Sequence, residues 1–303
     1  MARKRTLPQR SGVLNIDKPP GWTSHDVVAR VRRIVGERQV GHAGTLDPAA
    51  SGVLPVAVGH ATKILPYIED ATKAYVATVR FGVTTDSGDR DGRLLSALGP
   101  GSLSARAIED VLGQFRGDIA QVPPMHSAIK VGGQKLYDLA RKGIEVDVPT
   151  RTVTIHAIEL ADWVPPDATI RVECSSGTYI RSLARDLGEA LGTGAMLANL
   201  VRVRAGRFHL ATSIPIDRLE ERLETHGWLW IAVHPDDLLI DAPIVVLDAD
   251  DERRWFNGLG IRADGHTGIV RVYDTRREWV GIGLADAESG VIQPKRVVRG
   301  ERG

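Results

Sequence analysis

The sequence predicts an α+β protein in which a large mixed domain is followed by a small β domain. Helical and strand patterns are interspersed over residues 12–209, whereas only short strands joined by polar turns are predicted after residue 240. The 303 residues, 43% of them hydrophobic, provide enough apolar surface for two cores. We therefore divide the chain into a basic tail at 1–11, a mixed domain at 12–240 and a β domain at 241–303.

The first predicted elements are a strand, a helix and a second strand. Residues 12–17 form a short apolar run, which the proline-containing segment 18–21 ends. Ser24 is expected to cap a helix that continues to about Val35, because apolar residues then recur at helical spacing. The buried positions of this helix would be Val27, Val28, Val31, Ile34 and Val35. The apolar run 53–58 predicts the next strand.

The middle of the chain contains a strand, a polar turn and a helix. Residues 73–82 alternate in polarity and predict a strand. One face of it would present Tyr75, Ala77, Val79 and Phe81. The acidic segment 86–92 resembles a calcium-binding loop but lacks the final glutamate ligand, so we predict a polar turn. Ser104 is expected to cap a helix with Ile108, Val111, Leu112 and Phe115 on its buried face.

The remaining elements follow a loop-rich segment at 121–143. Strands are expected at 151–160 and 168–174, and Thr178 is expected to cap a helix that extends to about residue 191. A strand at 199–209 would follow. The β domain would consist of strands at 268–273, 278–284 and 291–298.

The composition excludes several classes of protein. No segment approaches the roughly 20 apolar residues of a membrane span, and no apolar segment follows the basic N-terminus as in a signal peptide. The single cysteine, Cys174, excludes an internal disulfide and a thiolate zinc cluster. The nine histidines have no paired metal-ligand spacing. We therefore expect a cytoplasmic protein without a bound metal.

The net charge of +1 is unevenly distributed along the chain. Residues 1–40 contain nine basic and three acidic side chains, whereas residues 212–250 contain nine acidic and two basic ones. Such asymmetry is compatible with a polyanionic partner on one face and equally with an ordinary solvated surface.

The segment 41–54 combines three glycines with a proline and predicts tightly turned backbone. Pro48 pushes the backbone of Asp47 toward an extended conformation, which fixes the carboxylate on the loop. Two interpretations of Asp47 are open on this pattern alone. It closes the turn by accepting a hydrogen bond from its own backbone, or it is an active-site carboxylate at a loop tip.

Arg181 is expected in the first turn of the helix that follows residue 177. Its spacing with Arg185 and Glu189 favours an exposed polar row on one helix face. However, a cation at this end of a helix is disfavoured by the helix dipole. A carboxylate or a phosphate is therefore expected beside Arg181.

Five sequence blocks, found in one order, together resemble the TruB family of pseudouridine synthases. They are Asp17-Lys18-Pro19-Pro20-Gly21 with Thr23-Ser24, Gly41 to Pro48 with Ser51-Gly52-Val53-Leu54, Lys73-Ala74-Tyr75 with Val79-Arg80-Phe81-Gly82, Pro123-Pro124-Met125 through Ser127-Ala128 to Leu136-Tyr137, and Gly177-Thr178-Tyr179-Ile180-Arg181. The blocks cover residues 12 to about 205. His126 departs from the pattern, since the family usually has a tyrosine there. The C-terminal domain resembles a small RNA-binding β-barrel of the PUA-like type.

The resemblance implies the pseudouridine synthase fold, with a mixed, mainly antiparallel sheet flanked by helices and loops. It also implies the reaction, which is the isomerisation of uridine 55 in the T-loop of tRNA. The base is flipped out, the glycosidic bond is cleaved, and C5 of the uracil is joined to C1′ of the ribose. The partner would be the T-stem-loop of tRNA. Neither a cofactor nor an obligate protein partner is implied.

The resemblance further implies roles for individual residues. Asp47 matches the catalytic carboxylate, and Arg181 matches the arginine that pairs with it. Tyr75 would stack on the flipped base, and base stacking of about 1–3 kcal/mol would offset much of the cost of flipping. His42 would act as a wedge near the vacated position, and Leu200 would line the base pocket. The other implied substrate-binding residues are Tyr179 and, as phosphate contacts, Lys18, Lys130 and Arg202.

Three alternatives remain at this stage. The first is a relative that is guided by a small RNA, and the second is an RNA-folding factor whose catalysis is incidental. The third is an aspartate-dependent glycosidase, which would need a second carboxylate about 5–9.5 Å from the first. No acidic residue near the matched blocks is an obvious second carboxylate.

Overall fold

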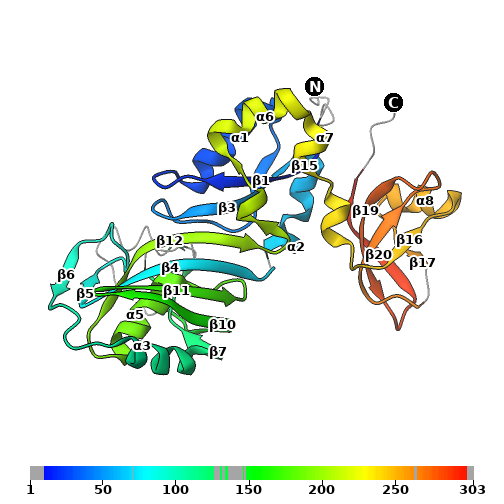
Figure 1. The fold of residues 1–303 in the computed structure, drawn as a ribbon. Coiled ribbons are helices and arrows are strands. Elements are labelled where there is room, and N and C mark those ends of the chain that lie inside the picture. Colours follow the sequence, from blue (N-terminus) through cyan, green and yellow to red (C-terminus); the bar gives the residue numbers. More distant parts are fainter. Residues whose placement is uncertain are drawn as a thin grey trace.

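The structure is a computed structural model that describes residues 10–69, 71–125, 130–131, 134–135, 146, 148–262 and 265–298. A large sheet with its helices forms one part of the molecule, and a smaller sheet forms the other (Figure 1). The basic tail predicted at 1–11 lies almost entirely outside the described residues.

The large sheet contains eleven strands, eight of which form one continuous path. In order across the sheet these are β14 (Ile214–Pro215), β1 (Gly12–Lys18), β3 (Ser51–Val58), β12 (Ala195–Ala205), β4 (Lys73–Phe81), β11 (Asp167–Cys174), β10 (Arg151–Val164) and β7 (Gly117–Gln121). Off this path, β2 (Val40–His42) pairs with β3, β13 (Phe208–His209) with β12, and β15 (Ala232–Val233) with β1. The β1–β14 and β3–β12 pairs are parallel and the others are antiparallel, so the mixed, mainly antiparallel sheet is confirmed.

Two groups of helices cover different halves of the sheet (Figure 1). The helices α1 (Ser24–Val35) and α6 (Leu219–His226) pack on one face of β1 and β3, while the 3-10 turn at Gly59–Ile64 and α2 (Leu65–Glu69) cover the other face. The helices α3 (Ala105–Leu112) and α5 (Ile180–Ala190) pack against β4, β11 and β10. Strand β3 is thus buried on both faces, which explains its continuous apolar sequence, whereas β4 alternates because only one face is fully covered.

The two halves are joined where β3 pairs with β12. Ser51 lies opposite Val201, and Gly52 lies opposite Arg202. Gly52 has a φ of +100°, and a Cβ atom there would lie 2.3 Å from the backbone oxygen of Arg202. The junction therefore requires glycine at this position both for its backbone conformation and for the close approach of the strands.

We expect Gly52→Ala to destabilise the protein by more than about 2 kcal/mol, because the new methyl group must separate the two strands. Thermal and urea unfolding would measure the loss. Gly192→Ala is a matched control, since Gly192 also has a positive φ (+69°) but a Cβ atom there would meet nothing within 4 Å. Equal losses in the two variants would mean that backbone strain alone, and not the strand contact, explains the effect.

The structure changes two of the predicted helix caps. Thr23, not Ser24, is the N-cap of α1, and it forms a capping box with Asp26. The hydroxyl of Ser24 instead exchanges hydrogen bonds with the backbone of Leu46, so a tertiary contact decides between two neighbouring hydroxyls. At α5 the N-cap is Tyr179, and Thr178 donates its hydroxyl to the oxygen of Ser175. Ser104 is the N-cap of α3, as predicted.

Some strands also differ from the predicted ranges. The strand expected at 199–209 begins earlier, at Ala195, and is broken by a turn at Gly206 into β12 and β13. Two short hairpins were not predicted. They are β5 (Val83–Thr85) with β6 (Leu94–Ala97), and β8 (Lys130–Val131) with β9 (Gln134–Lys135).

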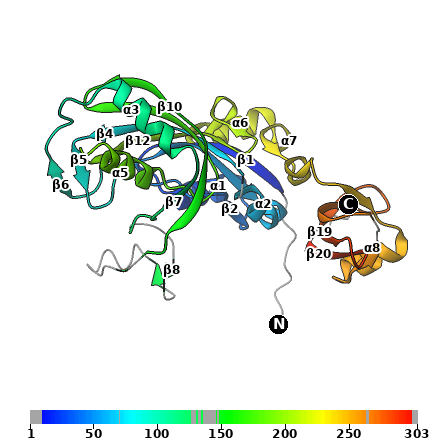
Figure 2. The same ribbon diagram turned by 90° about the horizontal axis from the view of Figure 1, so that it is seen from below.

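The C-terminal domain has five described strands rather than the three predicted. Their order is β16 (Ile244–Val246), β18 (Gly268–Tyr273), β19 (Trp279–Asp286), β20 (Val291–Val297) and β17 (Ile261–Arg262), with α8 (Ala249–Phe256) alongside. Trp255 of α8 fills the core of this domain and donates its indole N–H to the oxygen of Val280 at 3.0 Å. Figure 2 shows this domain at one end of the molecule, beyond α7 (Trp228–Ile231).

The two domains are in direct contact. Ile282 of β19 packs into a cluster with Val13 and Phe208 of the large domain. Lys63 donates its ammonium to the backbone oxygen of Val297, and Arg296 donates to the backbone oxygen of Lys63 at 3.2 Å. These contacts fix where the C-terminal domain lies beside the large sheet. Among the described residues, no helix is long and apolar enough to cross a membrane.

Candidate active site

Asp47 lies on the loop between β2 and β3, beside the junction of the two halves of the sheet. The hydroxyl of Ser24 accepts the N–H of Leu46 at 2.9 Å and donates to its oxygen at 3.2 Å. The N–H of Gly21 donates to the oxygen of Pro48 at 2.8 Å. The loop is therefore fixed on both sides of Asp47, and the carboxylate has a defined position.

Two buried cations hold the same loop from inside. The ammonium of Lys18, which is 0% exposed, donates to the backbone oxygens of Pro19, Trp22 and Pro48 at 2.9, 2.6 and 3.2 Å. Arg202, which is 1% exposed, donates to the oxygens of Val53 at 2.7 Å and Gly44 at 3.0 Å. Burial lowers the pKa of Lys18 to about 8.

The phosphate contacts predicted for Lys18 and Arg202 do not fit this geometry. Both side chains are buried. The ammonium of Lys18 and the Nε and Nη2 of Arg202 donate to backbone carbonyls. The family resemblance implied phosphate contacts for both residues, but local sequence does not show that long-range strand pairing buries them. Their role is to shape the loop that presents Asp47.

Arg181 pairs with Asp47 through two nitrogens. The Nε of Arg181 lies 2.9 Å from Oδ2 of Asp47, and its Nη2 donates to Oδ1 at 3.2 Å. The Arg181 side chain is only 6% exposed, so the exposed polar row that spacing favoured is wrong for this residue. The carboxylate expected from the dipole argument is present, and it is that of Asp47.

A second carboxylate contacts the same guanidinium. Oδ2 of Asp89 lies 3.6 Å from Nη1 of Arg181, and Nη1 also donates to the oxygen of Ser87 at 3.2 Å. Asp89 belongs to the 86–92 segment, which is the polar turn that was predicted but was given no function. Its backbone bridges to Leu197 of β12, so the turn is anchored at the site. Arg181 thus contacts two carboxylates with one positive charge.

Sequence reasoning missed Asp89 because no local pattern connects it to Asp47. The only signal was the density of acidic residues in a turn that lacks the final glutamate of a calcium-binding loop.

Among the described residues, no group of three or more histidine, cysteine, aspartate or glutamate side chains is arranged to hold a metal ion.

The surroundings of Asp47 shift its pKa in opposing directions. Burial raises the pKa of the carboxyl, the cation of Arg181 lowers it, and the charge of Asp89 raises it again, with a net increase above the ordinary value. The side chain is 39% exposed, but it faces a concave cavity whose walls limit its hydration. As the pH falls, an enzyme that needs ionised Asp47 will therefore lose activity at a higher pH than an enzyme that depends on a freely solvated aspartate.

We expect Asp89→Asn to move this acid limb to lower pH, because removal of a like charge lowers the pKa of Asp47. The maximal rate should fall by about tenfold, since Arg181 loses one of the groups that orient it. A pH profile of the single-turnover rate would measure both effects. Asp91→Asn in the same turn is the control, because its exposed carboxylate pairs only loosely with Arg90 at 3.9 Å. An acid limb that stays in place or moves to higher pH would contradict the electrostatic coupling.

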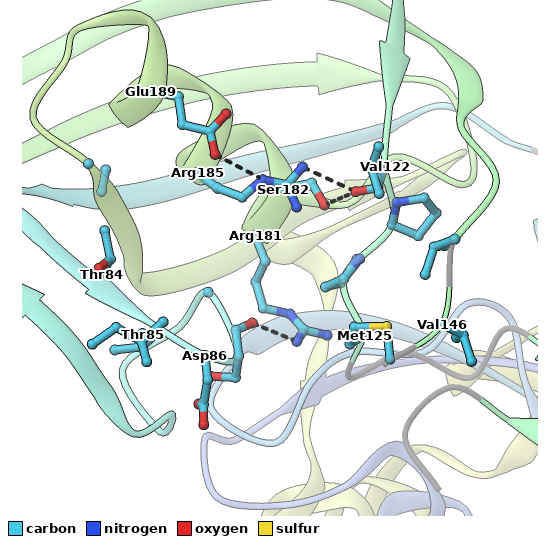
Figure 3. Close-up of a pocket in the computed structure, with 18 residues that line it drawn as sticks. Thr84, Thr85, Asp86, Val122, Met125, Val146, Arg181, Ser182, Arg185 and Glu189 are labelled. Atoms are coloured by element: carbon cyan, nitrogen blue, oxygen red, sulfur yellow. Dashed lines mark hydrogen bonds and ion pairs between the residues drawn. The ribbon is translucent and has the colours of Figure 1, made fainter. Parts of the chain in front are cut away.

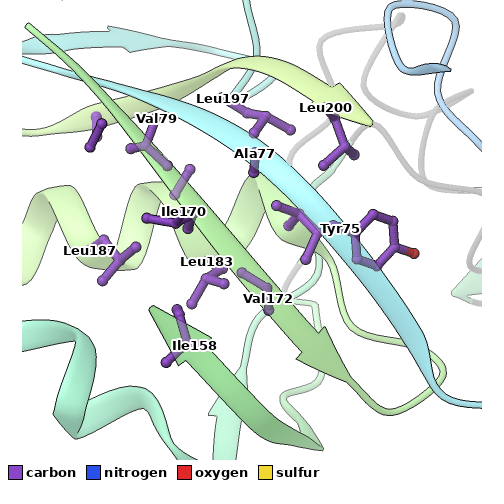
Figure 4. Packing of buried hydrophobic residues seen from close by; sticks show 14 of the residues in the cluster. Tyr75, Ala77, Val79, Ile158, Ile170, Val172, Leu183, Leu187, Leu197 and Leu200 are labelled. Carbon is purple, nitrogen blue, oxygen red and sulfur yellow. The ribbon is translucent and has the colours of Figure 1, made fainter. Parts of the chain in front are cut away.

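A cavity of about 550 Å³ opens in front of Asp47. Its lining includes Tyr75 of β4, Leu200 of β12, Tyr179 and the 44–48 loop. Tyr75 and Leu200 lie together at one end of the apolar cluster on β4, β11 and α5, and the hydroxyl of Tyr75 points away from that cluster (Figure 4). A lining that combines apolar side chains, two tyrosine rings and one fixed carboxylate suits a flat, polar-edged ring such as a nucleobase.

Arg181 also forms part of a second cavity, of about 490 Å³. This cavity is lined by residues 84–88 and 122–125 and by Ser182, which donates its hydroxyl to the oxygen of Val122 at 2.8 Å (Figure 3). The Arg181 side chain extends from α5 toward the Asp86 turn (Figure 3). Arg181 lines both cavities.

The other predicted site residues are placed as follows. Tyr179 is held at the start of α5, where its backbone N–H and oxygen both bond to the side chain of Gln121, at 2.8 and 3.1 Å. His42 ends β2, just before the loop of Asp47. Lys130 begins β8, but its side chain lies outside the described residues, and so does His126.

Comparison with known protein families gives three matches along the chain. Residues 32–180 match the N-terminal domain of the TruB family pseudouridylate synthases, and residues 181–234 match the tRNA pseudouridylate synthase B C-terminal domain. Residues 243–298 match the C-terminal domain of pseudouridine synthase II TruB. The chain belongs to the TruB family of pseudouridine synthases.

Curated TruB relatives resemble this chain over nearly its whole length. The tRNA pseudouridine synthase B of Gloeobacter violaceus is 45% identical over 287 residues, which cover 93% of this chain and 97% of the relative. The enzyme of the same name from a Synechocystis species is 47% identical over 295 residues, covering 95% and 99%. This TruB family chain is accordingly a tRNA pseudouridine synthase.

Two solved structures of similar fold are chains of larger complexes. A chain in the crystal structure of a Cbf5-Nop10-Gar1 complex matches with a TM-score of 0.72 and 27% identity, covering 98% of this chain and 90% of that one. A chain of an H/ACA RNP bound to a substrate RNA containing 2′-deoxyuridine matches with a TM-score of 0.71 and 26% identity, covering 96% and 86%. These matches confirm the predicted fold for this TruB family member.

Proposed function

We propose that this TruB family enzyme isomerises uridine 55 in the T-loop of tRNA, with Asp47 as the catalytic carboxylate. The N1–C1′ bond breaks and a C5–C1′ bond forms, while C5 loses its proton to solvent and N1 gains one. The reaction is a balanced isomerisation, and it needs neither an oxidant nor a reductant. The observation that supports it best is the fixed carboxylate of Asp47, paired in two places with buried Arg181 at the edge of an apolar cavity.

Each part of the cavity has a task in this proposal. Asp47, held ionised by the Arg181 cation, serves as base or nucleophile toward the nucleotide. Tyr75 and Leu200 receive the flipped uracil, whose stacking offsets the cost of leaving the T-loop. His42 fills the position that the base leaves. Tyr179, at the rim of the cavity, contacts the nucleotide as well.

The relatives favour an enzyme that acts on tRNA without a guide. The curated matches of 45% and 47% identity are named as tRNA enzymes, whereas the matching chains of the H/ACA RNP and of the Cbf5-Nop10-Gar1 complex are 26% and 27% identical. The presence of Asp89 close to Asp47 supplies the second acid that a glycosidase needs. However, Asp89 is bound to the far side of Arg181 and does not line the 550 Å³ cavity, so it is not placed to act on a substrate there.

The test is tritium release from a tRNA transcript labelled at C5 of uracil, with no other RNA present. The proposal expects release of one tritium per tRNA from the normal transcript and none from a transcript in which uridine 55 is replaced by cytidine. Release from the second transcript would show that another uridine is the target. Absence of release from both would overturn the proposed reaction on bare tRNA.

Replacing Tyr75 tests the base-stacking role. Tyr75→Leu should lower the single-turnover rate with tRNA by about 5- to 150-fold, the equivalent of losing roughly 1–3 kcal/mol of stacking. Tyr75→Phe keeps the ring and should retain most of the rate, with a modest loss because the hydroxyl interacts with Arg202. Unimpaired turnover by Tyr75→Leu would contradict stacking as the role of this ring.

A further inference from the structure

Two imidazole rings meet at the end of β2, beside the active-site loop. His25 is the second residue of α1, and His42 is the last residue of β2. Their ring centroids are 5.5 Å apart and their planes are nearly perpendicular, at 85°, which is the edge-to-face arrangement that aromatic rings prefer. His25 is exposed, and none of the site contacts described above uses it.

His42 is oriented by packing rather than by a hydrogen bond on its inner nitrogen. Its Nδ1 is buried and has no hydrogen-bond partner among the described residues. The charged or titratable groups that face the ring come from three elements: His25 from α1, Glu69 from α2 and Arg202 from β12. In the described structure the one aromatic ring in contact with His42 is that of His25, and its edge-to-face contact favours the observed direction of the His42 ring.

The position of His25 is itself fixed relative to the loop of Asp47. The residue before it, Ser24, exchanges two hydrogen bonds with Leu46 of the loop. The residue after it, Asp26, closes the capping box with Thr23. The first turn of α1 is thus attached both to its own cap and to the active-site loop, so the backbone of His25 is held at a defined place beside His42.

We propose that His25 is a positioning residue for His42, holding the His42 ring edge-to-face so that it enters the substrate RNA loop in one orientation. This inference rests on the proposed function, in which His42 fills the place of the flipped base. His25 acts through His42, and it does not contact the reacting nucleotide.

The charge state of the pair supports this arrangement. Burial lowers the pKa of His42, and the charge interactions with His25 and Arg202 lower it further, while Glu69 opposes them. His42 is therefore kept neutral near pH 7, as suits a ring that must pack among stacked bases. Replacement of His25 removes one of these interactions, so it should raise the pKa of His42.

The experiment compares His25→Ala with His25→Phe in the full-length protein. His25→Ala should raise the KM for tRNA about fivefold with little change in kcat, because the binding orientation of His42 is lost and the Asp47 chemistry is not. His25→Phe retains an aromatic ring and should restore a KM close to that of the wild type. Loss of activity in the phenylalanine variant equal to that in the alanine variant would overturn the edge-to-face role.

A double variant separates positioning from direct RNA contact. If His25 acts through His42, His25→Ala should have no further effect in a His42→Ala background. An additional fivefold loss in that background would mean that His25 contacts RNA itself, and it would overturn the proposal.

A readout without substrate keeps this test independent of the proposed reaction. The imidazole titration of His42, followed by NMR in the free protein, should move to higher pH in both His25→Ala and His25→Phe. An unchanged titration would overturn the coupling of the two rings. If wild-type protein releases no tritium from tRNA but the titration shifts, the proposed function fails while the coupling stands.

Discussion

Replacement of Asp47 by asparagine should reduce tritium release from tRNA by at least about 10⁴-fold while tRNA affinity stays within about threefold. Asparagine has nearly the same shape as aspartate, so the loop held by Ser24 and Lys18 should keep its conformation. The amide has no negative charge, however, and it can act neither as a base nor as a nucleophile. The loss should therefore fall on kcat and not on binding.

Single-turnover assays and filter binding with the same tRNA transcript would measure the two quantities separately. Asp91→Asn serves again as the control, because Asp91 has an exposed carboxylate that pairs loosely with Arg90 and does not line the cavity. Turnover by Asp47→Asn within tenfold of the wild type would exclude Asp47 as the catalytic carboxylate. If the wild type released no tritium while both proteins refolded tRNA equally well, the RNA-folding interpretation would be favoured instead.

Local periodicity was sufficient to predict the elements that frame the site. The alternation of 73–82 gave strand β4 and placed Tyr75 on its buried face, because a strand's side-chain period depends only on neighbouring residues. The apolar run 53–58 gave β3, which begins two residues earlier, at Ser51. The dipole argument for Arg181 predicted an acidic neighbour that the structure contains.

The remaining features depend on which segments the sheet brings together, and this pairing cannot be predicted from local sequence. Asp47 and Arg181 are 134 residues apart, and they meet because β3 pairs with β12 and α5 precedes β12. Asp89 reaches the same arginine through a bridge to Leu197. Lys18 and Arg202 likewise bind carbonyls that are distant in sequence, so the phosphate contacts that the family resemblance implied for them do not fit their burial.

Arg181→Lys should lower kcat by about 10²- to 10³-fold, although the positive charge is kept. The guanidinium binds both oxygens of Asp47 with two nitrogens, and its third nitrogen faces Asp89 and the oxygen of Ser87. An ammonium is a single point donor and cannot hold this planar set of contacts, so the direction of the Asp47 carboxylate should be lost. Because the side chain is 6% exposed, water cannot easily replace the missing contacts.

Comparison of Arg181→Gln with Arg181→Lys separates the effect of the positive charge from the effect of carboxylate orientation. Without the cation, the two carboxylates of Asp47 and Asp89 repel one another, which raises the pKa of Asp47 further and moves the acid limb of the pH–rate profile to higher pH. Arg181→Lys should also have a lower kcat, but its acid limb should move less, since the lysine charge still stabilises ionised Asp47. Arg185→Lys, one turn along the same helix and 36% exposed, should change neither quantity by more than about twofold. If Arg181→Lys matched the wild type within threefold, a nearby positive charge would be sufficient, and the two-nitrogen contact would have no part in the reaction.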